Sequence, residues 1–463
     1  MNRATLSSVL SDAVATLRPS ACPGLLRIVA ARDGGICRIR LPGGELTAAQ
    51  ASAIAGSSAL HGSGVIELTN RANLQVRGVR SGHEAALSAA LIGAGLGPID
   101  PASAAADDVR NVMISPLAGR DPAALIDTRP ICAELLALLQ GETRFAALSP
   151  KFALMLDGGE RLVRVDHPHD VWFAATATRD GVRFVFGLAG CAPRLQTGAA
   201  QHAAPALAAV LPSQVPALAR ALLLTFVDLA DADATRMRDL LAVRAVDTIL
   251  RHAQTYLDFP LTRDASLANW RGTAAADATL RLGAHRQHTP HLWHAGAQVP
   301  LGRLDAASLQ RLAVLAQRQG NATLHVTPWQ SVLLTDIAGH HVPAVLDEFD
   351  ALGLARERAQ PLARLIACTG SSGCAKGLAD TKADALQLAE RLPPDVDVHL
   401  SGCLRSCAAA HCAPYTLLAV APGLYDLYRR DAQPGFGECV AHRLTIDQAA
   451  SLLNQLARSA PDV

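Results

Sequence analysis

The sequence predicts an α+β fold made of two related halves, of which the second carries a metal centre. Three observations support this prediction. The two halves match without gaps at an offset of 258 residues, each copy reads as helix, strand, strand and helix, and four of the ten cysteines lie within 40 residues of one another. The first two observations define the fold, and the third indicates chemistry that belongs to one half.

The internal match begins where Pro42 of the first half aligns with Pro300 of the second. Further along, Thr69 aligns with Thr327, and turn residues and apolar positions keep this register over roughly 55 residues. A duplication explains the match, and a coincidence in a chain rich in alanine and leucine is the alternative.

In the first copy a helix is expected over 47–60, because Thr47 provides a cap directly after a turn. Two strands are expected over 65–69 and 74–78, where apolar and polar residues alternate. A second helix over 84–95 ends at a glycine.

The second copy predicts the same order, with a helix over 305–318, strands over 323–327 and 331–336, and a helix over 342–352. A unit of this kind belongs to an α+β sandwich. Each half is therefore expected to form one lobe.

Between the copies, 217–230 and 237–252 are expected to be helical. The segments 191–201 and 259–296 are rich in glycine, alanine, proline and threonine, which predicts connectors.

Composition excludes several classes of function. Lysine plus arginine number 42 against 41 acidic residues, so no general basic field attracts nucleic acid or a membrane surface. The N-terminus has no apolar signal segment, and the longest uncharged stretch, 196–219, holds three prolines. We expect a soluble, cytoplasmic protein with no nucleic-acid or membrane partner, in which any anion site is local.

The clustered cysteines form a CxxxxxC pair and a CxxxC pair, and the four are Cys368, Cys374, Cys403 and Cys407. Four thiolates suit a 4Fe-4S cluster, and the glycines around them let the chain wrap closely with its N–H groups toward the sulfides. A helix over 378–392 and a strand over 396–400 would bring the two pairs together.

Two alternatives remain open for these cysteines. Zinc also takes four thiolates, although structural zinc usually sits on tighter CxxC spacings. Buried cysteines can also serve as small apolar residues. Cys412 is a fifth thiol nearby, which we expect not to be a ligand.

Three cations lie at positions that favour a binding role. Arg71 falls in the turn between two predicted strands, and Arg110 and Lys151 follow further on. Arginine binds carboxylates in bidentate fashion and lysine contributes a point charge, but each of these residues alone is compatible with an ordinary surface charge. At the same offset of 258 residues Arg110 aligns with Cys368, which predicts a cationic wall opposite the cluster.

These motifs resemble the sulfite/nitrite reductase superfamily over nearly the whole chain. Its markers are the two cysteine pairs, the Thr69-x-Arg71-x-x-x-Gln75 signature, Arg110-Asn111 and the Lys151-Phe152 step. The start of the chain, with Ala21-Cys22-Pro23-Gly24-Leu25 and the run Asp33 to Gly44, is similar to the precorrin-3B synthases within it.

The resemblance implies a duplicated architecture of two ferredoxin-like half-domains plus two α/β domains that bind the cluster and a tetrapyrrole. The expected limits are 18–98 for the first ferredoxin-like repeat, 99–257 for the first α/β domain with the cationic wall, 278–356 for the second repeat, and 357–463 for the 4Fe-4S α/β domain.

It also implies the activity of such a synthase in aerobic cobalamin biosynthesis. That mono-oxygenase hydroxylates precorrin-3A with O2 and closes a γ-lactone, using a reductant, either NADH or a separate reductase. The implied cofactors are the 4Fe-4S cluster on the four cysteines and a mononuclear non-haem iron. The residues implied to pair with the substrate carboxylates are Arg71, Arg77, Arg110 and Lys151.

The main alternative is a sirohaem-dependent nitrite or sulfite reductase, and a third is a non-catalytic electron carrier. Ala153 stands where the reductases carry a second lysine of a Lys-Phe-Lys step, which favours the synthase. The catalytic residues and the ligands of the mononuclear iron are not located by the sequence. Two sets are candidates, His167-Pro-His169-Asp170 and the run His285, His288, His291 and His294.

Overall fold

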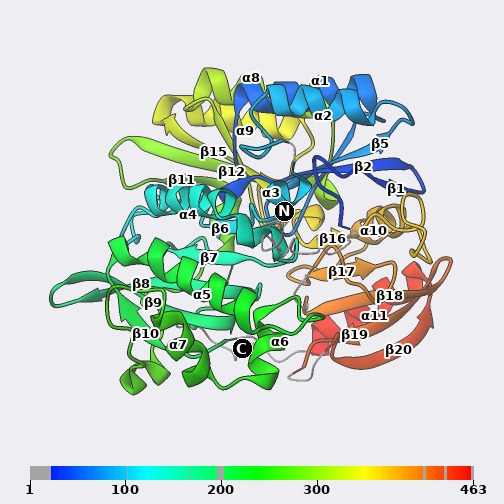
Figure 1. Cartoon of the computed structure of the whole chain (residues 1–463). Coiled ribbons are helices and arrows are strands. Elements are labelled where there is room, and N and C mark those ends of the chain that lie inside the picture. The colour runs from blue at the N-terminus through cyan, green and yellow to red at the C-terminus, as the bar shows by residue number, and fades with distance from the viewer. Residues whose placement is uncertain are drawn as a thin grey trace, which may run out of the picture.

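The computed structural model describes residues 22–101, 103–164, 166–194, 203–409, 413–431 and 435–459. Over these residues the strands form four five-stranded sheets. Two sheets lie beneath a common layer of helices, and the other two lie below them on opposite sides of the molecule (Figure 1). Cys412 and the ends of the expected domains, 18–21 and 460–463, lie outside the described residues.

The first ferredoxin-like copy follows its predicted order. Its elements are β1 (Val29–Ala31), β2 (Gly34–Ile39), α1 (Ala48–His61), β4 (Val65–Leu68), β5 (Leu74–Val79) and α2 (Glu84–Gly93). Thr47 caps α1, because its side-chain oxygen accepts a hydrogen bond from the Gln50 N–H. In turn, the Thr47 N–H donates to the Gln50 side-chain oxygen. The expected cap therefore forms, reinforced from both sides.

The second copy repeats this order with β11 (Gly283–Arg286), β12 (Leu292–Gln298), α8 (Ala306–Gln319), β14 (Thr323–Val326), β15 (Ser331–Ala338) and α9 (Val342–Ala351). The expectation of a connector over 259–296 is wrong at its end, because β11 and β12 pair there as an antiparallel hairpin. This hairpin is the counterpart of β1 and β2. Its histidines interrupt the alternation of apolar and polar residues from which a strand is predicted.

The two copies exchange a strand. β3 (Glu45–Thr47) of the first copy pairs with β14, and β13 (Arg303–Asp305) of the second pairs with β4. Gly44 precedes β3, and a Cβ there would stand 2.1 Å from the Val326 carbonyl oxygen, so only glycine lets the strands approach. Both copies bury their apolar side chains in one continuous core. The halves are thus one folded unit at this level.

The first α/β domain has sheet order β10-β9-β8-β7-β6. Its strands are β6 (Val112–Ile114), β7 (Leu154–Asp157), β8 (His169–Thr178), β9 (Gly181–Gly190) and β10 (Ala208–Val210). Its helices are α3 (Ala104–Asp108), α4 (Arg129–Gly141), α5 (Val215–Leu229), α6 (Met237–Val243) and α7 (Val246–Gln254). The single helix expected over 237–252 is two helices, because Arg244 and Ala245 adopt extended backbone and let each helix bury its own apolar face.

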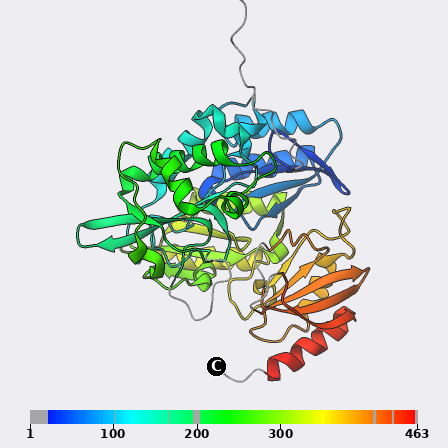
Figure 2. The same cartoon turned by 60° about the horizontal axis from the view of Figure 1, so that its bottom comes forward.

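The second α/β domain has sheet order β16-β17-β18-β19-β20. Its strands are β16 (Leu365–Ala367), β17 (Val398–Ser401), β18 (Tyr415–Ala421), β19 (Leu424–Arg429) and β20 (Glu438–Leu444). The helix expected over 378–392 is the shorter α10 (Thr381–Ala389), capped by Asp380. A last helix, α11 (Ile446–Ser459), lies on the outer side of this sheet (Figure 2).

No helix within the described ranges combines the length and the apolar character needed to cross a bilayer.

Candidate active site

The two cysteine pairs meet at one edge of the fourth sheet. Cys368 directly follows β16, Cys403 follows β17, and these strands run parallel, so their carboxyl ends lie side by side. The Cys368 N–H donates to the Leu400 carbonyl at 3.2 Å, and the Gly402 N–H donates to the Cys368 Sγ at 3.1 Å. The strand pairing therefore brings together cysteines that are 35 positions apart in the chain.

Three of the thiols are close enough to the fourth, Cys407, to act on it electrostatically. The pKa of Cys407 is raised first by burial and then by the charges of Cys403, Cys368 and Cys374. Among the described residues, however, no three of these sulfur atoms lie mutually within 4.8 Å. The thiols are therefore neighbours whose sulfur atoms stand further apart than the ligands of a single metal ion.

This spacing fits a cubane better than zinc. A tetrahedral zinc with Zn–S bonds of roughly 2.3 Å would hold its sulfurs about 3.8 Å apart. A 4Fe-4S cluster places each thiolate on a different iron and spreads them further. The Gly402 N–H aimed at the Cys368 Sγ is the type of backbone donor that stabilises cluster sulfur. The cysteines and their backbone therefore fit the predicted cluster.

The turn between β4 and β5 connects this centre with the predicted cations. Asn70 donates its side-chain N–H to the Cys407 carbonyl at 3.4 Å. The next residue, Arg71, donates from Nη1 to the Lys151 carbonyl at 3.3 Å. On the other side, Gln330 of the β14–β15 turn donates to the Ala408 carbonyl at 3.3 Å. Two symmetry-related turns thus flank the last cysteine.

Arg71 lies in a strongly positive environment. Burial, followed by repulsion from Arg236 and Arg38, lowers its pKa to about 10. Arg38 is within electrostatic range of the Cys407 thiol. Guanidinium groups held against one another in this way attract anionic ligands, because a carboxylate relieves their repulsion.

Sequence reasoning missed Arg38 and Arg236. Arg38 lies on β2, and with the Gln75 amide oriented so that its oxygen faces the guanidinium, the Arg38 Nη2 and Nε donate to that oxygen at 2.7 and 3.1 Å. The Arg236 Nε lies 3.0 Å from both carboxylate oxygens of Asp170. Gln75 belongs to the Thr69 signature, so its pairing across β2 could have indicated Arg38. Arg236 comes from the loop before α6 and has no sequence signal.

The position of Ala153 is a small, buried one beside these cations. Its N–H donates to the Asp170 Oδ2 at 2.9 Å, and Asp170 is the carboxylate that holds Arg236. His169 is buried beside them, where burial and then the charges of Arg71 and Arg236 lower its pKa to about 3. In place of a second lysine, this chain brings Arg236 close to Arg71 from another segment.

Arg77 and Arg110 have partners inside the protein. The loop over 368–377, which carries Cys368 and Cys374, is called the cluster loop. Arg77 binds Asp33 at 2.7 Å and donates to the Gly373 carbonyl of this loop at 3.0 Å. Arg110 donates to the Leu96 carbonyl at 2.9 Å and to Asp107 at 3.3 Å. These contacts favour a structural role for both over the predicted carboxylate contact. Lys151 remains exposed.

The alignment of Arg110 with Cys368 is wrong in the folded protein. β6 pairs with β7 at Val112–Leu154, and β16 pairs with β17 at Leu365–Val398, so Val112 is the counterpart of Leu365. Arg110 therefore precedes its strand, whereas Cys368 follows its own. The gapless offset ends before the α/β domains, and the cationic wall rests on Arg71 and its neighbours.

A buried charged network lies beneath the cluster loop. Glu67 on β4 binds Arg303 at 2.7 Å, accepts a bond from the Thr369 hydroxyl at 2.9 Å, and lies 3.7 Å from Lys382 on α10. Burial alone would raise the pKa of Glu67, but Lys382, Arg303 and Arg77 outweigh it and lower the pKa to about 2. The Lys382 Nζ also donates to the carbonyl of Ala367, beside Cys368.

Neither candidate set for a mononuclear iron assembles. Over the described residues, neither brings three ligand atoms within 4.8 Å of one another. Asp170 is committed to Arg236, while the Nε2 atoms of His285 and His294 lie 2.7 and 3.0 Å from backbone carbonyl oxygens.

The fold and this site define an α+β protein of two related halves, in which four neighbouring thiols lie beside a group of arginines. The family model of the nitrite/sulfite reductase ferredoxin-like half domain matches residues 30–94 and 285–352, and that of the nitrite and sulphite reductase 4Fe-4S domain matches 105–261. The chain belongs to the nitrite/sulfite reductase superfamily. The four clustered cysteines lie outside the matched ranges, in the second α/β domain.

Curated relatives carry two kinds of name. A precorrin-3B synthase from Sinorhizobium sp is 28% identical, covering 97% of this chain and 91% of its own length. A chloroplastic ferredoxin–nitrite reductase from Zea mays is 28% identical over 81% of this chain and 68% of its own. The solved NirA protein of Mycobacterium tuberculosis matches with a TM-score of 0.74 and 22% identity, covering 92% of this chain and 80% of that one. This structural match confirms the duplicated fold.

Proposed function

We propose that this chain catalyses the reaction of a precorrin-3B synthase in the cytoplasm, the O2-dependent hydroxylation and γ-lactone formation on precorrin-3A. One observation carries the proposal: near Cys407, the Arg71 guanidinium is close enough to those of Arg38 and Arg236 to be repelled by both. Precorrin-3A carries acetate and propionate arms, and arginine pairs with carboxylates through two parallel hydrogen bonds.

The choice of cations supports a large carboxylated substrate over a small oxyanion. Reduction of sulfite or nitrite gains from several lysine-like donors that converge on one small anion. At Ala153 this chain has no charge, and Arg236 is held by Asp170 instead of pointing freely at one spot. Exposed Lys151 adds a point charge for a further carboxylate.

The shares of sequence that align favour the synthase over two of the nitrite reductases, whereas a third, from Leptolyngbya laminosa, aligns over 90% of this chain and 85% of its own length. The precorrin-3B synthase aligns with nearly the whole of this chain and of itself. The nitrite reductases of Zea mays and Synechococcus elongatus leave about a quarter to a third of their own length without a counterpart, since 68% and 76% of them align.

In this proposal the protein residues bind and orient the substrate. Arg71 and Arg38 hold peripheral carboxylates, so that one face of the macrocycle lies toward Cys407. One oxygen atom of O2 enters the substrate and the other leaves as water, with two electrons from the reductant, and the ring A acetate supplies the lactone oxygen. When bound, the 4Fe-4S cluster supplies a path for electrons. Arg77 holds the cluster loop through the Gly373 carbonyl.

The experiment is a turnover assay on cluster-replete protein prepared without oxygen. The protein is mixed with precorrin-3A and a reductant, air is admitted, and the product is analysed by mass spectrometry. We expect a product heavier than precorrin-3A by one oxygen atom. An unchanged substrate mass with full cluster occupancy would contradict the proposal.

The second candidate is a sirohaem-dependent nitrite or sulfite reductase. Its supporting observation is the contact between the β4–β5 turn and Cys407. Asn70 of this turn donates to the Cys407 carbonyl, which places the Cys407 thiol near Arg71, where it could hold a sirohaem iron. Sirohaem content separates the two: a reductase retains one equivalent and reduces nitrite or sulfite, whereas the synthase shows only the broad absorbance of the cluster.

A further inference from the structure

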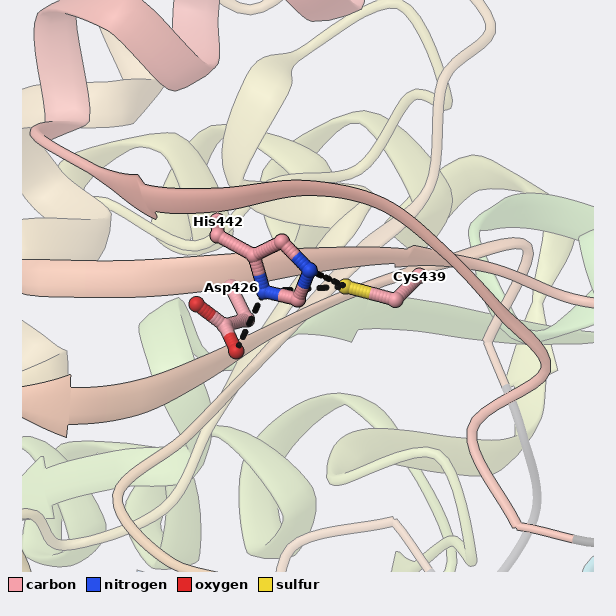
Figure 3. A group of neighbouring side chains, drawn as sticks. All are labelled: Asp426, Cys439 and His442. Atoms are coloured by element: carbon pink, nitrogen blue, oxygen red, sulfur yellow. Dashed lines mark hydrogen bonds and ion pairs between the residues drawn. The ribbon is translucent and has the colours of Figure 1, made fainter.

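Three potential metal ligands of different kinds meet on the outer edge of the fourth sheet. They are Asp426 on β19 and Cys439 and His442 on β20 (Figure 3). Their donor atoms all lie within 4.8 Å of one another, and over the described residues this is the only such group. The cluster and the arginines around Arg71 do not use these residues.

The backbone is bent to bring them together. In a regular strand, residues three positions apart point to opposite faces, so Cys439 and His442 should diverge. The pairing of β19 with β20 instead shifts register twice, between Tyr425 and Leu427 and again between Leu427 and Tyr428. Such bulges re-aim side chains and occur often at functional sites.

The bend also places a residue in an unfavourable conformation. Arg443, which follows His442, has a φ of 52°, a left-handed value that costs a residue other than glycine about 1 kcal/mol or more. Its N–H donates to the Asp426 Oδ1 at 2.9 Å, which leaves Oδ2 facing the His442 Nδ1 at 3.1 Å. The carboxylate is therefore oriented by the backbone, as outer hydrogen bonds orient metal ligands.

The distances fit the edges of a tetrahedron around zinc. The Cys439 Sγ lies 3.6 and 3.7 Å from the two ring nitrogens of His442. A tetrahedral zinc with Zn–N and Zn–O near 2.0 Å and Zn–S near 2.3 Å requires edges of about 3.5 Å for S–N and about 3.3 Å for N–O. The S–N and N–O spacings each agree with the structure within a few tenths of an ångström. Because Sγ is almost equidistant from both ring nitrogens, the exposed His442 ring must turn to aim one of them at the ion.

We propose that Asp426, Cys439 and His442 bind one zinc ion at a site separate from the cluster. Thiolate, imidazole and carboxylate together suit zinc, which accepts all three donor types. His442 has 72% of its side chain exposed, so the fourth position is open to water.

The site joins the outer strand to its neighbour. β20 is the edge strand of the sheet and β16 and β17, which carry the cluster loops, lie at the opposite end. At about 4.8 Å per strand, β20 is roughly 15 Å from β17. A metal that links β19 to β20 clamps an edge whose regular pairing is interrupted, and it stays independent of electron transfer at the cluster.

The test uses cluster-replete protein, so that the four cluster cysteines are not available to added zinc. Zinc is titrated into the protein, and bound metal is measured by equilibrium dialysis with elemental analysis. We expect one equivalent of zinc to bind, with its affinity at least 100-fold weaker in Cys439→Ala and in His442→Ala. The thermal unfolding midpoint should rise with zinc in the wild type alone.

His341→Ala is the matched control, because it removes a histidine from another surface, and it should keep the wild-type affinity. Cluster absorbance identifies any variant that fails to fold, and Cys439→Ser provides a conservative replacement in that case. Equal zinc binding by the wild type, Cys439→Ala and His442→Ala would overturn the proposal, as would the absence of a bound equivalent in the wild type. Neither result would affect the proposed reaction on precorrin-3A.

Discussion

The cluster loop depends on one close backbone contact. A Cβ on Gly377 would stand 2.6 Å from the Gly370 carbonyl carbon and 2.7 Å from the Ser371 nitrogen, both backbone atoms that cannot turn aside. The segment after Cys374 therefore packs directly on the segment after Cys368. The cysteines reach their positions because glycine permits this contact.

Gly377→Ala is expected to displace this loop and lower the iron content to less than half of the wild type. The measurement is iron and acid-labile sulfide per chain, together with visible absorbance. Gly56→Ala is the control, since a Cβ at Gly56 in α1 has no neighbour within 4 Å. A Gly377→Ala protein with full cluster content would show that the loop packs differently.

We expect the alanine variants of Arg71 and Arg110 to differ in substrate affinity and in stability, although both arginines lie in the first half of the chain. Arg71→Ala should raise the KM for precorrin-3A roughly 10- to 100-fold, because a charged hydrogen-bonded contact is worth about 1.5–3 kcal/mol. Arg110→Ala should leave KM unchanged and lower the unfolding midpoint, because buried Asp107 then keeps only one of its two arginine partners, Arg40. Steady-state kinetics and thermal unfolding of both variants test this. A larger KM effect at Arg110 would reverse the two roles.

At the scale of elements, α10 and β4 place a buried cation beside the cluster. Lys382 on α10 lies in electrostatic range of Cys368, and burial, partly offset by Glu67, lowers its pKa. A positive charge close to a cluster favours its reduced, more negative state. The network of Lys382 with Glu67 and Arg303 is therefore expected to tune the reduction potential.

Lys382→Met should lower the reduction potential of the cluster by on the order of 50 mV, since a unit charge at an effective dielectric of about 20 still acts over several ångströms. The measurement is a redox titration followed by electron paramagnetic resonance. Lys376→Met removes the same charge from the exposed part of the loop, where solvent screens it, and should shift the potential far less. Equal shifts in both variants would contradict a special role for the buried lysine.

The elements that the sequence predicted are those with local signals. The capping Thr47 and the alternation in β4 and β5 are read directly from neighbouring residues. The break at Arg244 and the exchange of β3 and β13 depend on what packs against them, and no local pattern encodes that. For the same reason the four cysteines could be predicted as ligands from their spacing, while Arg236 comes from a distant loop and was missed.

At the scale of the whole molecule, the duplication keeps the fold and changes the chemistry. The pairing of β7 with β6 matches that of β17 with β16, so Gly158-Gly159 stands where the second half has Gly402-Cys403. Glu160 follows, and burial together with Asp157 raises its pKa to about 8. One half therefore holds the thiolates and the other a buried carboxyl pair.

The shared core also predicts the stability of the protein in acid. Burial, followed by the charges of Arg120 and Arg129, lowers the pKa of His325 to about 3, against about 6.5 in an unfolded chain. The folded state therefore resists protonation. The stability contributed by neutral His325 is complete above pH 6.5 and is lost as the pH falls toward 3, by about 2 kcal/mol at pH 5.

Denaturant unfolding at pH 7.5 and pH 5 measures this effect. The wild type should lose about 2 kcal/mol more than His325→Leu between the two values, because leucine cannot be protonated. Identical pH dependence in the two proteins would mean that His325 is accessible to protons in the folded state.

The central claim is that Arg71 and its neighbours hold a tetrapyrrole as substrate. A single turnover under labelled dioxygen tests it most directly. Cluster-replete protein is mixed with precorrin-3A and reductant under ¹⁸O2, and the product is analysed by mass spectrometry. We predict one labelled oxygen atom in the product, and much less product from Arg71→Ala at low substrate concentration. A product without the label, or no product from a fully loaded protein, would contradict it.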